Sequence, residues 1–592
     1  MLFRSPAQYD VSLLRSLLFE NNTRDLFRIC LIFAICVIFF LIMAYRIDQT
    51  PDIHLDEILY YHVAYNLATQ AEFSWNMRPV LVHPPVQFLS QALFLHLIGL
   101  TDEFLPFYGT YTVRLVNAFA GAFTLAILFR LIERLSGLRA ALLASMIFIL
   151  DPFVVRINRR NMLETMAEMW VVIGFYVFWR ERNRLTNAKM MLIGAIFGVA
   201  LLTKELMVFG MAVIPLFIIL TGRWHDIKKT LLMCGVAVFI WTLFPFWAWT
   251  VDHGPKFLDN KTFNLRRLIG LVQVTGWNRP GVSFMGALQV NLEQYGSSYI
   301  LIIIGAIVTL ILFFTWRNER GRFVLAWSGM IYGFSVYIIL AGTLNEFFFY
   351  YLMLPIVTTL STMTIRYWDL WKGESKAEPE EEKAGVLVLT RLDELPKWIS
   401  VVAQAIDRRL VMIADFVKRV GQRIAHNRPI ANGLLLFIIL FGLSIQSFNL
   451  YRWVKLFALE EDKVLYELVQ YVRENLPPDA QLNSMFGAGD VMLPYMLPEY
   501  EFVALRDPNA IDERNVVYTM LSSKNLWGAY GDITPEYYDW VETHGELLFR
   551  TYGNTFWEVT LYRIPLGKEG SLEVLQGLEA AEEELLELLN GE

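Results

Sequence analysis

The fold is decided by an uninterrupted apolar stretch near the N-terminus, Ile29–Tyr45, which reads ICLIFAICVIFFLIMAY. No charged residue lies between Arg28 and Arg46, and no small-residue cleavage pattern follows. The stretch is therefore typical of a retained membrane anchor and not of a signal peptide. We predict a transmembrane helix here.

The composition of the whole chain also indicates a membrane protein. Of the 592 residues, 55% are hydrophobic and 18% are charged, against roughly 25% charged in ordinary soluble proteins. Further apolar runs follow the first and give about 11 predicted transmembrane helices in all. The later runs lie at about residues 110–133, 140–156, 162–179, 189–203, 206–221, 230–250, 297–316, 323–341, 347–365 and 431–449.

The distribution of Lys and Arg orients these spans, because short basic loops stay in the cytoplasm. The basic connections fall on one side of the predicted membrane if the eleven spans are right, and they lie at residues 4–28, 130–139, 180–189, 223–229 and 317–322. The N-terminus is then cytoplasmic. The C-terminal part, residues 451–592, holds 10 basic and 26 acidic residues and is placed outside. We expect a multi-pass protein of the plasma membrane.

The predicted spans divide the chain into five parts. These are a cytoplasmic N-terminus (1–28), a transmembrane module (29–365), a cytoplasmic linker with an amphipathic helix (366–430), a last transmembrane helix (431–449) and a small extracytoplasmic α/β domain (450–592). Two outer loops of the module, 46–109 and 251–296, are long enough to hold chemistry. The apolar run Val80–Leu100 in the first loop contains His83-Pro84-Pro85 and is expected to be a juxtamembrane or re-entrant helix.

An acidic pair, Asp56 and Glu57, follows the first span by a few residues. The residues after it continue in a helical pattern, so Asp56 lies at or near a helix start. One interpretation is that Asp56 caps the helix and Glu57 favours its dipole. The other is that a carboxylate beside an apolar bundle serves as a general base. Both remain open from the residues alone.

Several Lys and Arg residues lie on the predicted outer side, although the positive-inside rule places such residues in cytoplasmic loops. They are Arg114 at the start of the second span, Arg159 and Arg160 in the next outer turn, and Lys204 in the turn after that. Placing a charged side chain in or near the membrane costs free energy. Several cations at the same depth therefore suggest an anionic ligand such as a lipid phosphate. The alternative is local pairing, of Arg160 with Glu164 and of Lys204 with Glu205.

The remaining motifs are less specific. The His residues near Asp56 fit no zinc spacing, so no metal site is indicated, although a divalent ion is possible. No Walker loop or complete GxGxxG motif appears, and we expect no nucleic-acid partner. The aromatic run that ends at Tyr351 is either an interfacial belt or a platform for a sugar.

In order and membrane side, these motifs resemble the GT-C glycosyltransferases. The sequence is similar to the protein O-mannosyltransferases and the aminoarabinose transferases of lipid A over about residues 25–365. The resemblance is carried by the acidic pair at 56–57, by Val82-His83-Pro84-Pro85, by Val113-Arg114-Leu115, by Arg159 with Glu164, by Leu202-Thr203-Lys204 and by Tyr350-Tyr351-Leu352. Two family features differ: Gln87-Phe88 replaces a Gly-Lys, and the loop 251–296 is too short for the sugar-binding trefoil repeats.

The resemblance implies a GT-C fold and an inverting sugar transfer. The donor would be a polyprenyl-phosphate monosaccharide, and the acceptor a hydroxyl of an envelope glycan, lipid or protein at the outer face. It implies Asp56 as the catalytic base with Glu57 as its neighbour. It further implies that Arg114, Arg159, Arg160 and Lys204 hold the phosphate, that His83, Glu164 and Tyr351 position the substrates, and that no cofactor is obligatory. A polyprenyl-phosphate-sugar flippase without transfer chemistry is the alternative.

Overall fold

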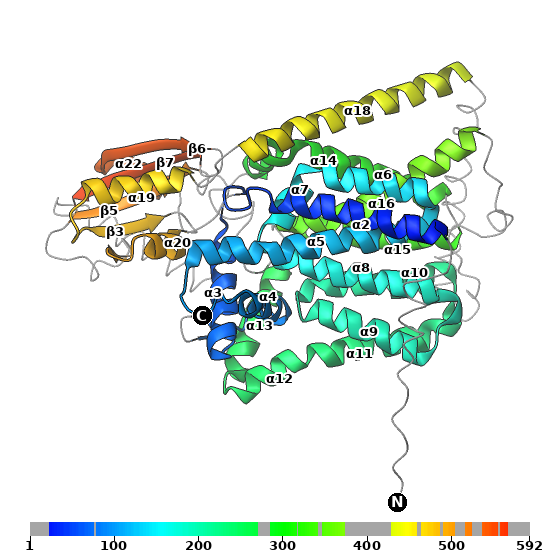
Figure 1. The fold of residues 1–592 in the computed structure, drawn as a ribbon, viewed down its shortest axis with the longest axis horizontal. Helices are drawn as coiled ribbons and strands as arrows, with labels where there is room; N and C mark the ends of the chain where they lie inside the picture. The colour runs from blue at the N-terminus through cyan, green and yellow to red at the C-terminus, as the bar shows by residue number, and fades with distance from the viewer. Residues whose placement is uncertain are drawn as a thin grey trace, which may run out of the picture.

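The computed structural model contains a long helical bundle with a small sheet domain at one end (Figure 1). It describes residues 23–372, 419 and 428–565, with internal gaps at 52, 76–77, 270, 272–283, 316–317, 341–345, 459–462, 486–488, 504–515, 524–534 and 554–556. The predicted amphipathic helix of the linker lies outside these residues. So does most of the N-terminal segment 1–28.

Sixteen α-helices form the membrane-associated part among the described residues, together with three short 3-10 helices and a two-stranded ribbon. The first half comprises α2 (Thr23–Ala44), α3 (Leu55–Gln70), β1 (Ser74–Trp75), β2 (Arg78–Pro79), α4 (Val86–Ile98), α5 (Pro106–Ser136), α6 (Leu138–Leu150), α7 (Pro152–Arg159), α8 (Leu163–Glu181) and η1 (Arg182–Arg184). The second half comprises α9 (Asn187–Leu201), η2 (Glu205–Met207), α10 (Val208–Thr221), η3 (Trp224–Asp226), α11 (Ile227–Trp241), α12 (Leu243–Thr250), α13 (Gly254–Leu268), α14 (Phe284–Thr315), α15 (Glu319–Leu340), α16 (Glu346–Lys372) and α18 (Arg428–Ala458).

The apolar runs form these helices because a helix satisfies its own backbone hydrogen bonds where water is absent. Helix α5 packs against α2, α6 and α8, and α8 packs against α9, which in turn packs against α11. One continuous apolar core joins them, and its largest fully buried side chains include Trp179, Trp327 and Phe129. Helix α4 packs on α3 and α5 while Leu89, Leu93 and Leu97 remain exposed, as expected of a juxtamembrane helix.

The third predicted span is broken. Helices α6 and α7 meet at an angle of 68° instead of forming one straight span over 140–156. The break follows from Asp151-Pro152: proline at the first position of α7 cannot continue the preceding helix. The Asp151 carboxylate caps α7 by accepting from the backbone N–H groups of Phe153 and Val154, both at 3.0 Å. It also accepts from Ser298 Oγ at 2.8 Å.

By length and composition, six helices among the described residues are able to cross a membrane, or seven if α6 and α7 are one bent span. They coincide with seven of the eleven predicted spans. The other four predicted spans are helices, α8, α9, α10 and α18, but they fall outside this set. Helix α8 carries Glu164, Glu168 and Arg180. Helices α9 and α10 have 15 and 14 residues, about 22 Å, which is shorter than the ~30 Å hydrocarbon core.

The C-terminal domain is a five-stranded mixed sheet with helices, which confirms the predicted small α/β domain. The strand order is β4-β3-β5-β7-β6, with β3 parallel to β4 and β5, and β7 antiparallel to β5 and β6. Its elements are α19 (Lys463–Asn475), β3 (Gln481–Met485), α20 (Gly489–Met496), β4 (Glu501–Phe502), β5 (Val516–Ser522), α22 (Pro535–His544), β6 (Glu546–Gly553) and β7 (Trp557–Pro565).

The domain shares its core with the first outer loop. Ile53 and Ile58 are buried in the same cluster as Val464, Leu468 and Leu482. His62 Nδ1 and the hydroxyl of Tyr495 in α20 lie 2.9 Å apart. The sheet domain therefore supports the N-terminal turns of α3, the helix that carries the acidic pair (Figure 1).

Candidate active site

The acidic pair lies in the first turn of α3, but Asp56 is not its cap. The residue at the cap position is His54, whose side chain accepts from the backbone N–H of Asp56. Glu57 Oε2 accepts from the backbone N–H of His54 at 2.9 Å, which completes a capping box. The interpretation of Asp56 as the N-cap is therefore wrong, because His54 supplies the cap and leaves the Asp56 carboxylate available for other contacts.

Glu57 is buried and bound on several sides. Its carboxylate accepts from Arg114 Nε at 3.0 Å and Nη2 at 2.7 Å, a bidentate pair in which both side chains are fully buried. The backbone N–H of Asn161 donates to the same carboxylate. Arg114 Nη1 also donates to the carbonyls of Ile47 and Pro51, both at 2.9 Å. Glu57 and Arg114 thus tie the first outer loop to α5.

Arg159 and Arg160 are buried at the end of α7. The Arg159 guanidinium donates to the backbone carbonyls of Ile42, Arg46 and Thr50 at 2.7 to 3.1 Å, and so holds the chain that follows the first span. The carbonyl of Arg160 accepts from Asn117 Nδ2 at 2.7 Å. The guanidinium groups of Arg114 and Arg159 donate to protein oxygens, which does not favour their predicted role as phosphate ligands. Arg160 is 1% exposed, and its role as a phosphate ligand stays a prediction.

Buried amides complete this network, and the sequence analysis missed them. Asn161 Nδ2 donates to the carbonyl of Glu57 at 3.2 Å, and Asn161 Oδ1 accepts from Gln87 Nε2 at 3.1 Å and from Gln91. Asn117 joins α5 to the turn between α7 and α8. The available signal was their chemistry: an amide in an apolar segment needs a partner, and these amides occur at one level of the bundle.

Asp56 has a different environment from Glu57. Its side chain is 36% exposed. The phenol of Tyr60, one turn further along α3, hydrogen-bonds to the Asp56 carboxylate. Burial raises the pKa of Tyr60 well above its ordinary value, and the negative charge of Asp56 adds to this, so Tyr60 stays a protonated donor. Tyr60 was not predicted, although its i, i+4 spacing from Asp56 is the available signal.

His83 joins the same group through Tyr60. Its ring lies edge-on to the Tyr60 ring, with 5.6 Å between the centroids. Since His83 directly precedes Pro84 and Pro85 at the start of α4, the rigid loop fixes its position. His83 and Asp56 therefore both contact the same tyrosine.

Lys204 pairs with Glu164, not with Glu205. Its ammonium group donates to Glu164 Oε1 and lies 5.9 Å from the centre of the Tyr351 ring. The Lys204 side chain is 16% exposed and that of Glu164 is 1% exposed. The negative charge of Glu164 also acts on the phenol of Tyr60, which links this pair to Asp56. Asp56, His83, Glu164, Lys204 and Tyr351 therefore form one group around Tyr60.

Glu205 is held by other partners. Its carboxylate accepts from Trp241 Nε1 at 3.0 Å and from Lys261 Nζ at 2.8 Å. Lys261, on α13 of the second outer loop, also donates to the carbonyl of Val82 at 3.1 Å. Burial lowers the pKa of Lys261, while the Glu205 charge opposes that shift. The second outer loop is therefore fastened both beside His83 and beside Lys204.

The group was also compared with the ligand sets that bind metal ions in proteins. Among the described residues, no set of three or more His, Cys, Asp or Glu side chains is placed to bind a metal ion. The groups available here are a partly exposed carboxylate, an ammonium group and a phenol at one end of an apolar helical bundle. Such a set suits proton abstraction beside a bound anion.

Part of the chain that carries this group matches a known protein family. Residues 82–249 match the family model described as dolichyl-phosphate-mannose-protein mannosyltransferase. The matched segment contains His83, Arg114, Arg159, Glu164 and Lys204, so the resemblance seen in the sequence is confirmed there.

Two groups of solved structures are similar to the chain. One is ArnT from Cupriavidus metallidurans bound to undecaprenyl phosphate, with 14% identity and a TM-score of 0.48, over 90% of this chain and 97% of that one. The other is the archaeal oligosaccharyltransferase AglB from Archaeoglobus fulgidus in complex with an inhibitory peptide and a dolichol-phosphate. It has 12% identity and a TM-score of 0.47, over 90% of this chain and 74% of that one.

Proposed function

We propose that the protein transfers a monosaccharide from a polyprenyl-phosphate donor to a hydroxyl group of an envelope acceptor at the outer face of the plasma membrane. The observation that carries the proposal is the group around Tyr60: the partly exposed Asp56 carboxylate hydrogen-bonds to this phenol, and Glu164, the partner of Lys204, lies near enough to act on the same phenol. The family match over residues 82–249 supports it. The apolar helices support a lipid-linked donor, whose tail lies in the bilayer.

In the proposed reaction, the acceptor hydroxyl attacks the anomeric carbon of the donor sugar. Its proton passes to the Asp56 carboxylate, a new carbon–oxygen bond forms, and the bond from the anomeric carbon to the phosphate oxygen breaks. Displacement from the opposite face inverts that carbon. The polyprenyl phosphate leaves as a stable anion, so it needs no proton, and Lys204 stabilises its charge.

The neighbouring side chains have supporting roles in this proposal. Tyr60 holds the Asp56 carboxylate, His83 contacts the acceptor, and Glu164 and Tyr351 orient Lys204. Glu57, Arg114 and Arg159 maintain the outer loop that carries Asp56. Because an ammonium group supplies the charge, we expect no obligatory metal.

Purified full-length protein in lipid nanodiscs, given radiolabelled undecaprenyl-phosphate sugars and envelope extracts, tests the function. A labelled glycan, lipid or protein product is expected, and it should persist in EDTA. Movement of the donor across a vesicle without product would instead identify a flippase. No product and no movement with any donor would contradict both functions.

The base assignment has its own test. Asp56→Asn keeps the size of the side chain but removes the proton acceptor, so we expect the transfer rate to fall about 10²- to 10⁴-fold. The matched control is Asp102→Asn, at an exposed position of the same outer loop. Full activity of the Asp56→Asn protein with normal expression would show that Asp56 is not the catalytic base.

A further inference from the structure

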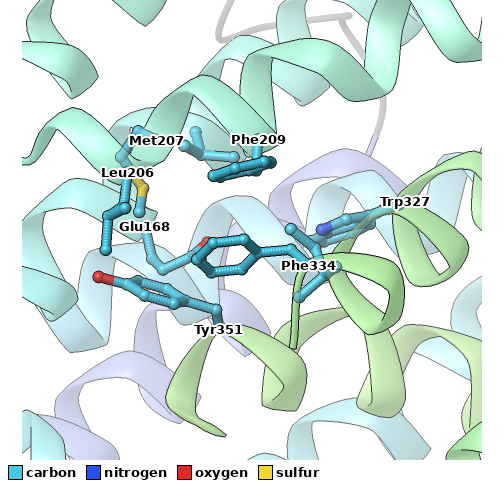
Figure 2. A pocket seen from close by; sticks show the side chains of 10 residues that line it. Glu168, Leu206, Met207, Phe209, Trp327, Phe334 and Tyr351 are labelled. Carbon is cyan, nitrogen blue, oxygen red and sulfur yellow. The ribbon is translucent and has the colours of Figure 1, made fainter. Parts of the chain in front are cut away.

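A small cavity is lined by Tyr351, which contacts Lys204, and by Glu168, one turn of α8 beyond Glu164. Its walls come from α8, η2, α10, α15 and α16. Figure 2 shows the carboxyl group of Glu168 and the ring of Tyr351 at this cavity, with Phe209, Phe334 and Trp327 around it. The cavity has room for a group about the size of a water molecule.

Two polar atoms at this cavity, and a third one turn away, are buried without a hydrogen-bond partner among the residues that the structure describes. They are Glu168 Oε2, the Tyr351 hydroxyl and Glu164 Oε2. Glu168 is 3% exposed, and no contact joins it to a cation in the described part of the chain. Each unsatisfied buried group costs about 1–3 kcal/mol, and a charged one costs more. Three of them in one place indicate that something polar completes the site.

The group that fits here must form a hydrogen bond with a buried carboxyl group. A carboxyl group buried without a cation takes its neutral form, which both donates and accepts, whereas an ammonium group beside it would ionise it. A hydroxyl or an ammonium group therefore satisfies Glu168. The aromatic walls suit either the apolar face of a sugar or a cation. An isoprene unit of the lipid tail is larger than the cavity, and it would also leave the Glu168 carboxyl group without a partner.

The cavity is also at the right place for a sugar substituent. Glu164 and Glu168 are four residues apart on one face of α8, about one helical turn or 5.4 Å. Glu164 binds the Lys204 ammonium, which also faces the Tyr351 ring. If Lys204 holds the phosphate of the donor, the attached sugar has to span only about one helical turn, ~5.4 Å, to reach Glu168.

We propose that Glu168 and Tyr351 form a specificity subsite that accepts one hydroxyl or ammonium substituent of the donor sugar. The proposal rests on the function proposed above. The subsite binds one substituent and not the whole ring, and it selects among sugars by what that substituent can donate. A sugar with hydrogen in place of that substituent leaves Glu168 unpaired and binds more weakly.

Binding of two kinds of lipid to the full-length protein in nanodiscs tests the subsite. The probes are sugar-free undecaprenyl phosphate and undecaprenyl phosphate bearing mannose, glucose, galactose or 4-amino-arabinose. For the sugar-bearing lipid that binds best, Glu168→Gln should raise Kd about tenfold, because the hydrogen bond or ion pair between the sugar substituent and the carboxyl group is weakened. The Kd of the sugar-free lipid should not change. Tyr351→Phe should act in the same direction with a smaller effect.

Glu133→Gln is the matched control, since Glu133 is a poorly exposed glutamate near the other end of α5 that pairs with Arg28 and Arg130. It should change neither Kd. A best ligand with an amino group would identify the substituent as ammonium, and a neutral hexose would identify it as hydroxyl.

Three results overturn the subsite and leave the proposed function standing. In the first, the Kd values of both lipids rise equally in Glu168→Gln, which means that the effect does not depend on the sugar. In the second, neither Kd changes while the melting temperature falls, which means that a buried water fills it. In the third, the wild-type protein binds no sugar-bearing lipid more tightly than the sugar-free one. A wild-type protein that binds neither lipid would contradict the proposed function as well.

Discussion

Two ion pairs, Glu57–Arg114 and Glu164–Lys204, differ in how many of their polar atoms are hydrogen-bonded within the protein. In the Glu57–Arg114 pair, both side chains are fully buried, and the guanidinium and carboxylate groups each bind further protein groups. In the Glu164–Lys204 pair, the lysine is partly exposed, and one carboxylate oxygen has no hydrogen-bond partner in the described part of the chain.

This difference indicates a structural role for the Glu57–Arg114 pair and a ligand-binding role for Lys204. Arg114 forms a planar fork that matches one carboxylate and two carbonyls, so it fixes the loop in place and leaves little for a ligand. Lys204 is a compact point charge on a flexible stem, partly exposed and paired with a carboxylate of which one oxygen has no hydrogen-bond partner among the described residues. Cations that look equivalent in the sequence are therefore expected to respond differently to substitution.

The largest effect is expected from Arg114→Met. Removal of one partner leaves the Glu57 carboxylate buried and unpaired, which typically costs about 3–5 kcal/mol. Most of the protein should be lost before purification, as measured by fluorescence-detected gel filtration and thermal melting. The double variant Arg114→Met with Glu57→Met is the control, and it should recover part of the stability. A folded Arg114→Met protein with weakened donor binding would instead make Arg114 a ligand.

The next effect is expected from Lys204→Met, in donor binding. The Kd for undecaprenyl phosphate should rise about tenfold, since a charge-assisted contact contributes about 1.5–3 kcal/mol. The melting temperature should fall as well, because the Glu164 side chain is 1% exposed and loses its cation, so Kd is compared on folded protein isolated by gel filtration. Lys229→Met, at the other end of the bundle, is the control. An unchanged Kd would count against Lys204 as the phosphate ligand.

A smaller effect is expected from Tyr60→Phe, which tests the bridge between the acid and the lysine. The variant keeps the packing against His83 and Phe88 but loses the hydrogen bond to Asp56. The loss of about 1 kcal/mol of positioning should lower kcat about fivefold and leave the donor KM unchanged. An unaltered kcat would show that Asp56 needs no support from the phenol. Tyr65→Phe on the same helix serves as the control.

The smallest effect is expected at the contact between α3 and the sheet domain. Burial lowers the pKa of His62 below its ordinary value of 6.5, so the docked imidazole stays neutral beside Tyr495. Unfolding exposes His62 and lets it take up a proton, so this contribution to stability is complete above pH 6.5 and is lost as the pH falls through the lowered pKa. The melting temperature should therefore drop slightly more on acidification in the wild type than in His62→Gln. An identical pH dependence in the two proteins would contradict the coupling.

The sequence by itself determined the positions of the helices, because long apolar runs in a chain with few charges have almost no other stable structure in a bilayer. It also located the acidic pair, the His83-Pro84-Pro85 loop and the cations predicted to lie outside. Those cations depart from the positive-inside rule, and this departure is visible in the sequence without knowledge of any contact. The helices at residues 463–475 and 535–544 in the sheet domain follow from local patterns in the same way.

Only the tertiary structure decided which carboxylate meets which cation. Glu57 and Arg114 are 57 residues apart, and Glu164 and Lys204 are 40 apart, so no local spacing rule relates them. The same holds for Glu168 and Tyr351, which meet at one cavity from two helices, and for Ile58, which completes the core of a distant domain. Pairing of this kind depends on how the helices pack, and packing depends on side-chain shape across many residues. For this reason the sequence identified the outer cations as a group, whereas their separation into structural and reactive members required the folded chain.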